Sequence, residues 1–214
     1  MDALGRLRLD LAGCGAPRYI PGMATPSTML ELGTPVPDFS LVDVRTGETV
    51  SLADFADARG LLVMFICNHC PFVKHVRGEL AALGRDYDGK GLAIVAINSN
   101  DATTHPQDGP PYMKAEAAAQ GYGFPYLFDE RQEVAKAFRA ACTPDFYVFD
   151  RDRRLAYRGQ LDGSRPGNRV PVTGADLRAA CDAVLDGASP AAAQTASVGC
   201  NIKWRAGNAP DYYG

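Results

Sequence analysis

Two unbroken apolar runs, at 61–66 and 92–97, constrain the fold more than any other feature of the sequence. A short, continuous apolar run is typical of a central strand that is buried on both faces of a sheet. Between the two runs, the segment 71–87 has apolar residues on one helical face: Phe72, Val76, Leu80 and Leu83. The sequence therefore predicts a sheet whose buried strands are joined through a helix.

The rest of the pattern continues this alternation. Hairpins are predicted at 38–52 and 146–159, and a short strand at 125–128. Further helices are predicted at 112–120, 132–140 and 175–186. This order predicts an α/β fold, with a central mixed β-sheet flanked by helices, an N-terminal β-hairpin and a C-terminal tail. We divide the chain into three parts: a flexible N-terminal arm at 1–31, one domain at 32–187, and the tail at 188–214.

Composition excludes several classes of protein. The 214 residues are 46% hydrophobic and 22% charged, as in globular proteins, and six cysteines are too few for a disulfide scaffold. The net charge of -3 argues against nucleic-acid binding, which requires a basic face. The sequence has no apolar run of about 18 residues, the length that spans a membrane. We therefore expect neither nucleic acid nor a membrane as a partner.

The N-terminal residues bear on the compartment. Leu11-Ala12-Gly13-Cys14 resembles a lipoprotein cleavage site, but an export signal needs an apolar run before it, and the preceding residues include charges: Asp2, Arg6, Arg8 and Asp10. We therefore expect a cytoplasmic protein. Thiols stay reduced there, and closely spaced cysteines tend to be catalytic or to bind metal.

The chemistry is predicted at Cys67-Asn68-His69-Cys70, where a buried strand gives way to a helix. The unpaired N–H groups and positive dipole end of a helix N-terminus favour a thiolate. We expect Cys67 to be the nucleophile, with a pKa below that of a free thiol, and Cys70 to be the resolving thiol. Pro71 suits the first turn of the helix, where its missing N–H is not needed.

Two histidines lie close to the cysteines in the sequence: His69 and His75. A His69 N–H directed at the thiolate would stabilise the reduced pair, whereas a solvated loop histidine would have no such role. Cys67, Cys70 and His75 could hold copper or zinc, but a structural zinc site needs four ligands, usually with a second paired motif. The sequence has no such motif. We therefore predict neither a metal nor a cofactor.

Several blocks of sequence resemble those of one superfamily. They are Pro37-Asp38-Phe39-Ser40-Leu41, Thr49-Val50-Ser51-Leu52-Ala53-Asp54-Phe55, Cys67-Asn68-His69-Cys70-Pro71-Phe72-Val73-Lys74-His75, Phe124-Pro125-Tyr126-Leu127, Cys142-Thr143-Pro144-Asp145-Phe146, Tyr157-Arg158-Gly159-Gln160 and Cys200-Asn201-Ile202-Lys203-Trp204. Together they resemble the alkyl hydroperoxide reductase/thiol-specific antioxidant (AhpC/TSA) superfamily and, more narrowly, its peroxiredoxin-like, thioredoxin-family redoxins.

The resemblance implies a thioredoxin-like fold and a cis peptide bond at Thr143-Pro144, in a loop that faces the two cysteines and pairs with a bound partner. It places Thr143 and Pro144 with Cys67, Cys70 and His69 in the catalytic site. The implied activity is thiol–disulfide exchange through a Cys67–Cys70 disulfide. Its partners would be protein or small-molecule disulfides and a reductant of the thioredoxin or glutathione type.

The sequence departs from both nearest patterns. Peroxiredoxins have Thr or Ser and Pro three and seven residues before the peroxidatic cysteine, where this chain has Met64 and Gly60. Thioredoxins have Trp and a buried Asp before the first cysteine, where this chain has Ile66 and Leu61. We therefore rank disulfide exchange ahead of the alternative, a thiol peroxidase with Cys67 peroxidatic and Cys70 resolving.

Other residues leave alternatives open. Cys142 could be a third redox thiol or a small buried hydrophobe, Cys181 lies on an apolar helix face, and Cys200 could reach back from the tail as a resolving thiol. The loop 98–111 could shape a partner site or be merely solvated; it contains Asp101, His105 and Asp108. Two arginines could contact a substrate anion: Arg158 and Arg165.

Overall fold

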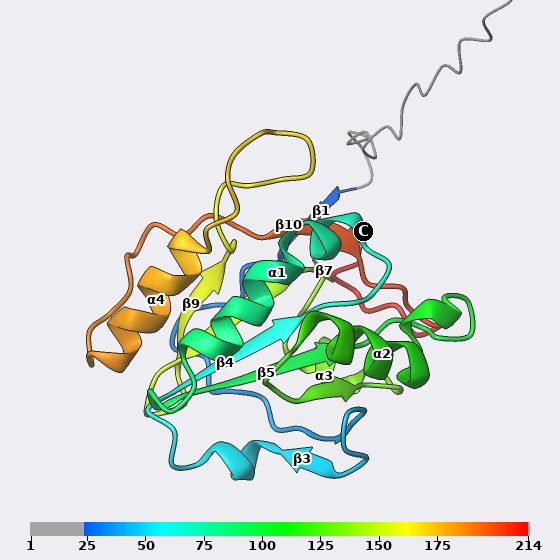
Figure 1. Cartoon of the computed structure of the whole chain (residues 1–214), viewed down its shortest axis with the longest axis horizontal. Helices are drawn as coiled ribbons and strands as arrows, with labels where there is room; N and C mark the ends of the chain where they lie inside the picture. The colour runs from blue at the N-terminus through cyan, green and yellow to red at the C-terminus, as the bar shows by residue number, and fades with distance from the viewer. Residues whose placement is uncertain (1–23, 214) are drawn as a thin grey trace, which may run out of the picture.

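The computed structural model describes residues 24–213 and is built on a seven-stranded sheet of order β3-β2-β6-β5-β4-β8-β9 (Figure 1). The strands of this sheet are β2 (Ser40–Asp43), β3 (Thr49–Ser51), β4 (Gly60–Phe65), β5 (Leu92–Asn98), β6 (Tyr126–Phe128), β8 (Asp145–Phe149) and β9 (Leu155–Gly159). β4, β5 and β6 run parallel to one another, whereas β2, β3, β8 and β9 pair antiparallel with their neighbours. The sheet is therefore mixed, as the sequence predicts.

The two apolar runs form the adjacent central strands. Every residue of β4 is buried, and in β5 only Ala93 is partly exposed. Alternate β4 side chains point to opposite faces, so Leu62 and Met64 join one hydrophobic cluster while Leu61 and Val63 join the other. Burial on both faces explains why these runs have no polar alternation.

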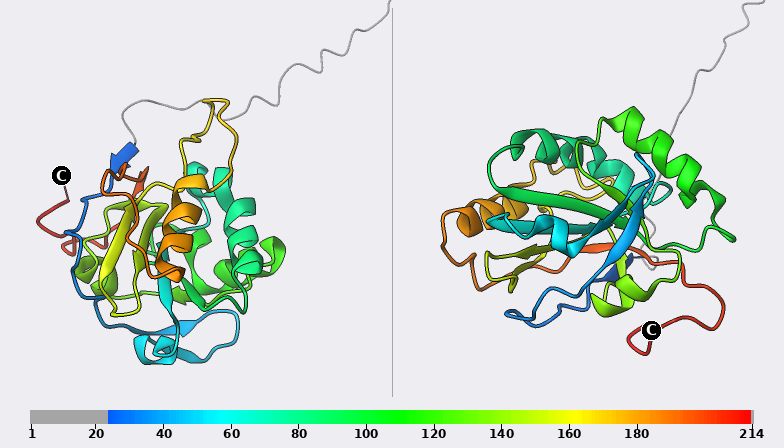
Figure 2. Two further views of the ribbon diagram at one scale, coloured as in Figure 1. Left: turned by 90° about the vertical axis from the view of Figure 1, so that its left-hand side faces the viewer. Right: turned by 90° about the horizontal axis from the view of Figure 1, so that it is seen from below.

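Helices cover both faces of the sheet (Figures 1 and 2). The helices are α1 (Pro71–Asp86), α2 (Pro110–Gln120), α3 (Glu133–Ala137) and α4 (Ala175–Leu185), with short 3₁₀ turns η1 (Leu52–Phe55) and η2 (Pro106–Asp108). Side chains of α1, α2 and α4 pack into one cluster, and those of α3 pack into the other. In the right-hand view of Figure 2, α1 and α2 lie above the sheet and α3 lies below it.

Element boundaries agree with the prediction to within two residues at most ends, and α3 is the main exception. The sequence predicts this helix at 132–140, but it ends at Ala137. Arg139 has a φ of 50°, in the left-handed region, which is incompatible with continuing a right-handed helix.

A second, three-stranded sheet of order β1-β10-β7 is not predicted from the sequence. It consists of β1 (Ala24–Pro26), β7 (Cys142–Thr143) and β10 (Val198–Asn201). β10 lies in the segment that the sequence analysis assigns to the tail, and it runs antiparallel to both neighbours. The two ends of the described chain are thereby brought together beside the N-terminus of α1, near the top of Figure 1.

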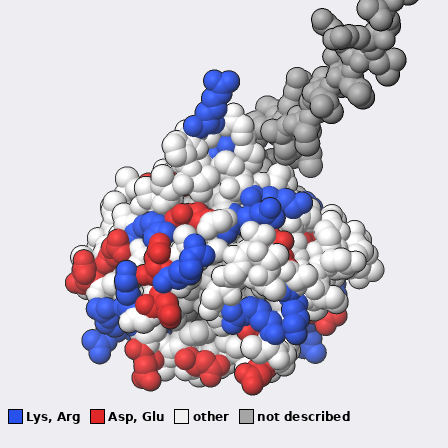
Figure 3. Space-filling view, in the orientation of Figure 1, with Lys and Arg blue, Asp and Glu red and all other residues white. Residues whose placement is uncertain are grey.

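The described surface is of mixed charge: basic and acidic side chains are interspersed over the face drawn in Figure 3. Among the described residues, no helix has both the length and the hydrophobicity needed to cross a bilayer. Cys14 and the cleavage-site resemblance around it lie outside the described residues.

Candidate functional site

Cys67 and Cys70 lie at the junction of β4 and α1. β4 ends at Phe65, and Cys70 is the N-cap of α1, with an extended backbone (φ -61°, ψ 125°) and Pro71 as the first helical residue. The fixed φ of proline favours the start of a helix, and its missing N–H would have no intrahelical partner there. The local sequence thus places both sulfurs at the positive end of a 16-residue helix.

Thr143 contacts both sulfurs. Its Oγ1 lies 3.3 Å from the Sγ of Cys67, and its carbonyl oxygen lies 3.2 Å from the Sγ of Cys70, which donates to it when protonated. The Thr143-Pro144 peptide bond is cis, as the family resemblance implies. The structure therefore brings together four of the five predicted catalytic residues around one pair of sulfurs.

The Cys67 sulfur is enclosed. Its residue is 1% exposed, with Thr143 Oγ1 on one side and the Nδ1 of His69, the fifth predicted residue, 3.9 Å away. Burial raises the pKa of the Cys67 thiol, and its hydrogen bond to Cys70 and the negative charge of Asp108 raise this pKa further.

Asp108 organises the loop between the two cysteines. Its carboxylate accepts hydrogen bonds from the backbone N–H groups of Asn68 and His69 at 2.8 and 3.2 Å, and from Nδ2 of Asn100 at 2.8 Å. Nδ1 of His69 lies 2.5 Å from Oδ2 of Asp108, the oxygen that also accepts from Asn100. Although burial opposes ionisation, the His69 and Asn100 hydrogen bonds lower the pKa of Asp108. The carboxylate is therefore ionised near neutral pH.

The loop 98–111 is thus part of the site through Asp108, one of the candidates that the sequence leaves open. His105 also belongs to the site, because its ring stacks on His69 with centroids 5.0 Å apart. Asp101 instead hydrogen-bonds within its own loop, to Thr103 and Thr104. The sequence singles out the loop but not Asp108 within it, because Asp108 is 39 residues from His69 in the chain.

The Cys70 sulfur is surrounded by hydrogen-bond donors. Burial opposes its ionisation, but the Cys200 and Cys67 thiols and the N–H groups of Val73 and Cys200 donate to it and lower the pKa of Cys70. When Cys70 ionises, it loses its hydrogen bond to the Thr143 carbonyl, and its thiolate accepts hydrogen bonds from these donors. The expectation of a lowered pKa at Cys67 is therefore wrong. The two thiols therefore shift in opposite directions: burial raises the pKa of Cys67, and the donors around Cys70 lower its pKa.

A possible metal-binding group differs from the one the sequence suggests. Ligand atoms of Cys67, His69 and Asp108 lie within 4.8 Å of one another. His75 instead lines a pocket beside Pro144, away from this group. Three ligands with one imidazole nitrogen already bonded to a carboxylate do not fit the four-ligand pattern of a structural zinc site.

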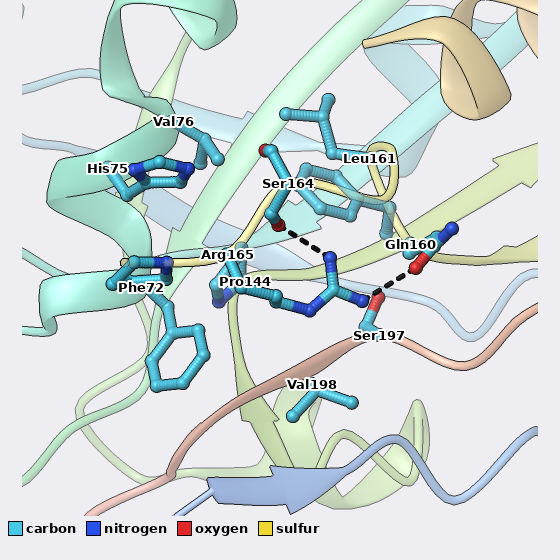
Figure 4. Close-up of a pocket in the computed structure, with 12 residues that line it drawn as sticks. Phe72, His75, Val76, Pro144, Gln160, Leu161, Ser164, Arg165, Ser197 and Val198 are labelled. Atoms are coloured by element: carbon cyan, nitrogen blue, oxygen red, sulfur yellow. Dashed lines mark hydrogen bonds between the residues drawn. The ribbon is translucent and has the colours of Figure 1, made fainter. Parts of the chain in front are cut away.

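A shallow pocket lies next to the cis-proline (Figure 4). Phe72, His75 and Arg165 line it together with Pro144. The Arg165 guanidinium is held by the Ser164 carbonyl and by Oε1 of Gln160, each at 2.6 Å. This pocket places a cation beside the loop that faces the sulfurs.

Arg158 does not contribute to this pocket. It is fully buried, lies 3.8 Å from the Asp145 carboxylate and stacks on the Tyr147 ring. The hypothesis that Arg158 contacts a substrate anion is therefore wrong, since the side chain belongs to the core.

The remaining described cysteines differ in their relation to the site. Cys142 is fully buried, and its Sγ lies 3.7 Å from the Pro144 carbonyl oxygen, as a small core residue would. Cys181 is fully buried on α4, as predicted. Cys200, in contrast, lies on β10 opposite Thr143, whose carbonyl oxygen is 3.2 Å from the Cys70 sulfur. The sequence raises Cys200 as a candidate but gives no signal for the strand that positions it.

Comparison with known proteins identifies close relatives of unassigned function. No curated protein sequence matches the chain. A hypothetical protein from Sinorhizobium meliloti 1021 is 56% identical, with a TM-score of 0.84 over 86% of this chain and 100% of that one. An uncharacterised conserved protein from Geobacillus kaustophilus is 54% identical, with a TM-score of 0.84 over 88% of this chain and 98% of that one.

More distant structures and a family model agree on the fold. A thiol:disulfide interchange protein of the thioredoxin family from Chlorobium tepidum TLS has a TM-score of 0.57 at 21% identity, over 72% of this chain and 97% of that one. At that identity the similarity supports the fold alone. The model of the AhpC/TSA family matches residues 32–158, more than half of the chain. The protein has a thioredoxin-like fold, and the chain belongs to the AhpC/TSA family.

Proposed function

We propose that the protein is a thiol–disulfide oxidoreductase that works through a Cys67–Cys70 dithiol/disulfide pair. The observation that carries this proposal is the contact of Thr143 with both sulfurs, at 3.3 and 3.2 Å, beside the cis-proline and at the N-terminus of α1. The shared hydrogen bond between the two thiols supports the same conclusion, since it requires the sulfurs to be neighbours.

The proposed reaction has two exchange steps. Cys67 attacks one sulfur of the substrate disulfide, forms a mixed disulfide and releases one substrate thiolate, which takes a proton from water. Cys67 passes its proton to the Cys70 thiolate along their hydrogen bond. Cys70 then attacks the Cys67 sulfur, its proton goes to the second departing thiolate, and the Cys67–Cys70 disulfide closes. The protein loses two electrons and the substrate gains two, and a thioredoxin-type dithiol or two glutathione-type thiols restore the reduced pair.

Roles for four further residues complete the proposal. Thr143 would orient Cys67 through its hydroxyl, and Pro144 would hold the loop against which a substrate lies. His69, fixed by Asp108, would position the loop that carries Cys67. The pocket with Arg165 would accept an acidic group of the substrate, because its guanidinium lies next to Pro144.

A thiol peroxidase is the second candidate, and one observation favours it specifically. At 1% exposure, Cys67 is more accessible to a small peroxide than to a protein disulfide. Met64 lies in the buried strand β4 and supplies no hydroxyl, but Thr143 brings one to Cys67 from another part of the chain. Attack on the peroxide would give a Cys67 sulfenic acid and an alcohol or water. Cys70 would then close the disulfide and release water.

The deciding experiment compares both substrates on one preparation. Initial rates are measured with insulin disulfides and with hydrogen peroxide, using dithiothreitol as the common reductant. We expect disulfide exchange to be faster, because a peroxide transition state needs fixed donors around the oxygen–oxygen bond and one missing donor costs about a hundredfold to a thousandfold in rate. Peroxide turnover without disulfide turnover would make the peroxidase the better assignment.

Metal content gives a separate check. We expect the purified protein to contain far less than one equivalent of zinc or copper, measured by mass spectrometry of the elements. One tightly held equivalent, lost in a Cys67→Ser variant, would support the metal-binding alternative instead.

A further inference from the structure

β10 occupies the backbone edge of β7, beside the cis-proline. In the register of this antiparallel pair, Cys200 lies opposite Thr143 and Asn201 lies opposite Cys142. β1 covers the other edge of β10, so β10 is a central strand of its own small sheet. The chain itself therefore uses the edge at which the family resemblance predicts pairing with a partner.

The approach of β10 to this loop is unusually close. A Cβ atom added to Gly199 would lie 2.0 Å from the carbonyl oxygen of Thr143 and 2.5 Å from its carbonyl carbon. No real side chain tolerates such a contact with backbone, so only glycine fits at this position. β10 is thereby seated against the residue that touches both sulfurs of the pair.

Cys200 follows this glycine and faces Cys70. It is 8% exposed, belongs to the same hydrophobic cluster as Cys70, and lies opposite Thr143, whose carbonyl oxygen is 3.2 Å from the Cys70 sulfur. Hydrogen bonding from Cys200 is also among the causes that lower the pKa of Cys70. That hydrogen bond and burial together raise the pKa of Cys200, so it remains a protonated donor. Cys70 is therefore placed between two thiols, Cys67 and Cys200.

We infer that Cys200 is a third redox thiol, which takes over Cys70 as its disulfide partner after the Cys67–Cys70 disulfide has formed. This inference rests on the proposed function of that pair. Cys200 attacks the sulfur of Cys70. The Cys70–Cys200 bond forms, the Cys67–Cys70 bond breaks, and Cys67 leaves with the proton that Cys200 loses. The step is an exchange, so the oxidation state of the protein does not change.

The geometry selects Cys70 rather than Cys67 as the partner. The hydrogen-bonding partners of the Cys67 sulfur are Thr143, His69 and Cys70, whereas Cys200 donates to Cys70. The exchange would return Cys67 to the thiol form while the oxidised bond lies against β10. The protein could then hold one disulfide and still present the attacking thiol to a second substrate.

Cys142 provides a matched comparison. It is adjacent to Thr143 and fully buried, like the site cysteines, but its thiol is directed at the carbonyl oxygen of Pro144. A thiol that is close to the pair but not directed at it should form no disulfide with Cys70.

The inference can be tested by peptide mapping of the full chain. Trypsin would leave Cys67 and Cys70 together in peptide 60–74, and Cys181 together with Cys200 in peptide 179–203. A Cys181→Ala background therefore assigns any cross-link to Cys200. The reduced protein is oxidised with the thiol-specific oxidant diamide at low protein concentration, free thiols are alkylated, and monomers are isolated before digestion.

We expect peptide 60–74 to be linked to peptide 179–203 through Cys70, with Cys67 alkylated. Adding Cys200→Ala should lower the yield of this cross-linked species at least tenfold, whereas adding Cys142→Ala should leave the yield unchanged. Cys67→Ser should raise its yield, because the competing disulfide cannot form. The Cys67→Ser variant keeps both Cys70 and Cys200. It therefore tests the Cys70–Cys200 disulfide even if the Cys200→Ala variant folds poorly.

Each contrary result has a distinct meaning. If the only disulfide in the oxidised monomer is the one within peptide 60–74, the Cys200 inference is overturned and the proposed function stands. If peptide 60–74 forms no disulfide of either kind, both are overturned. A link from Cys200 to Cys67, or one confined to covalent dimers, would overturn the assignment of Cys70 as the intramolecular partner.

Discussion

The two sulfurs of the site lie three residues apart and occupy opposite environments. Cys67 is enclosed by its own loop, with the ionised Asp108 nearby, so its charged form is disfavoured. Cys70 is surrounded by donors from the first turn of α1 and from β10, so its charged form is favoured. The two cysteines of one C-x-x-C motif therefore differ because of the segments packed around them, and not only because of their order in the chain.

The two regions also differ in what holds them. The Cys67 side is held by the carboxylate of Asp108, which belongs to a distant loop. The Cys70 side is held by backbone pairing between β7 and β10 and by the close contact of Gly199 with Thr143. Four predictions test this difference, each with variants on one or both sides of the pair.

The largest effect is expected on the Cys67 side, from Cys67→Ser. Removing the attacking thiol should lower disulfide and peroxide turnover by at least about a thousandfold, as loss of a nucleophile does in other enzymes. Cys70→Ser should instead allow the first step and accumulate a mixed disulfide through Cys67, visible as a mass increase. Trapping through Cys70 in the Cys67→Ser variant would reverse the two roles.

On the Cys70 side, Gly199→Ala should lower the free energy of unfolding by about 3 kcal/mol, because the new methyl group overlaps the Thr143 carbonyl. Urea denaturation measures this. The matched control is Gly78→Ala, an exposed helix position with open space around it, where the same change should stabilise by about 0.5–1 kcal/mol. Equal effects of the two substitutions would show that β10 is not seated as described.

Asp108→Asn tests whether the Asp108 carboxylate holds the loop that carries Cys67. Losing the charge that accepts from His69 and Asn100 should cost about 2 kcal/mol at pH 7. Because the folded-state pKa of Asp108 is lowered, its contribution is fully present above the ordinary pKa of about 3.8 and is lost as the pH falls through the folded value. The stabilities of wild type and variant should therefore converge below about pH 3. A difference that does not depend on pH would contradict this account.

The smallest effect is expected on the titration of the Cys70 thiol, in the Cys200→Ala variant. Cys200→Ala removes one donor to the thiolate, so the thiolate absorbance at 240 nm should titrate about one pH unit higher than in the wild type. Cys142→Ala should leave the titration in place, because Cys142 donates elsewhere. Equal shifts in both variants would mean that the sulfur responds to general packing rather than to Cys200.

Most of the large sheet and all four helices can be predicted from the sequence, because their signals are local. The apolar runs of β4 and β5 and the apolar face of α1 are each readable within one window of the chain. The motif at the β4–α1 junction is readable for the same reason, since strand, cysteines and helix are contiguous.

The parts that could not be predicted depend on pairing between distant segments. β1 and β10 are three and four residues long, have no regular alternation, and are held by each other and by β7. Asp108 is an ordinary loop aspartate until the fold brings it to the Asn68 and His69 backbone. The lowered pKa of Cys70 follows from these same contacts, so it could not be read from the motif either.

The position of β10 has a consequence for synthesis of the chain. The strand that completes the surroundings of Cys70 lies near the C-terminal end, more than fifty residues after the cis-proline loop against which it packs. At about 5–20 residues per second, translation takes several seconds to cover that interval. During this time the growing chain has both site cysteines but not the strand that covers Cys70.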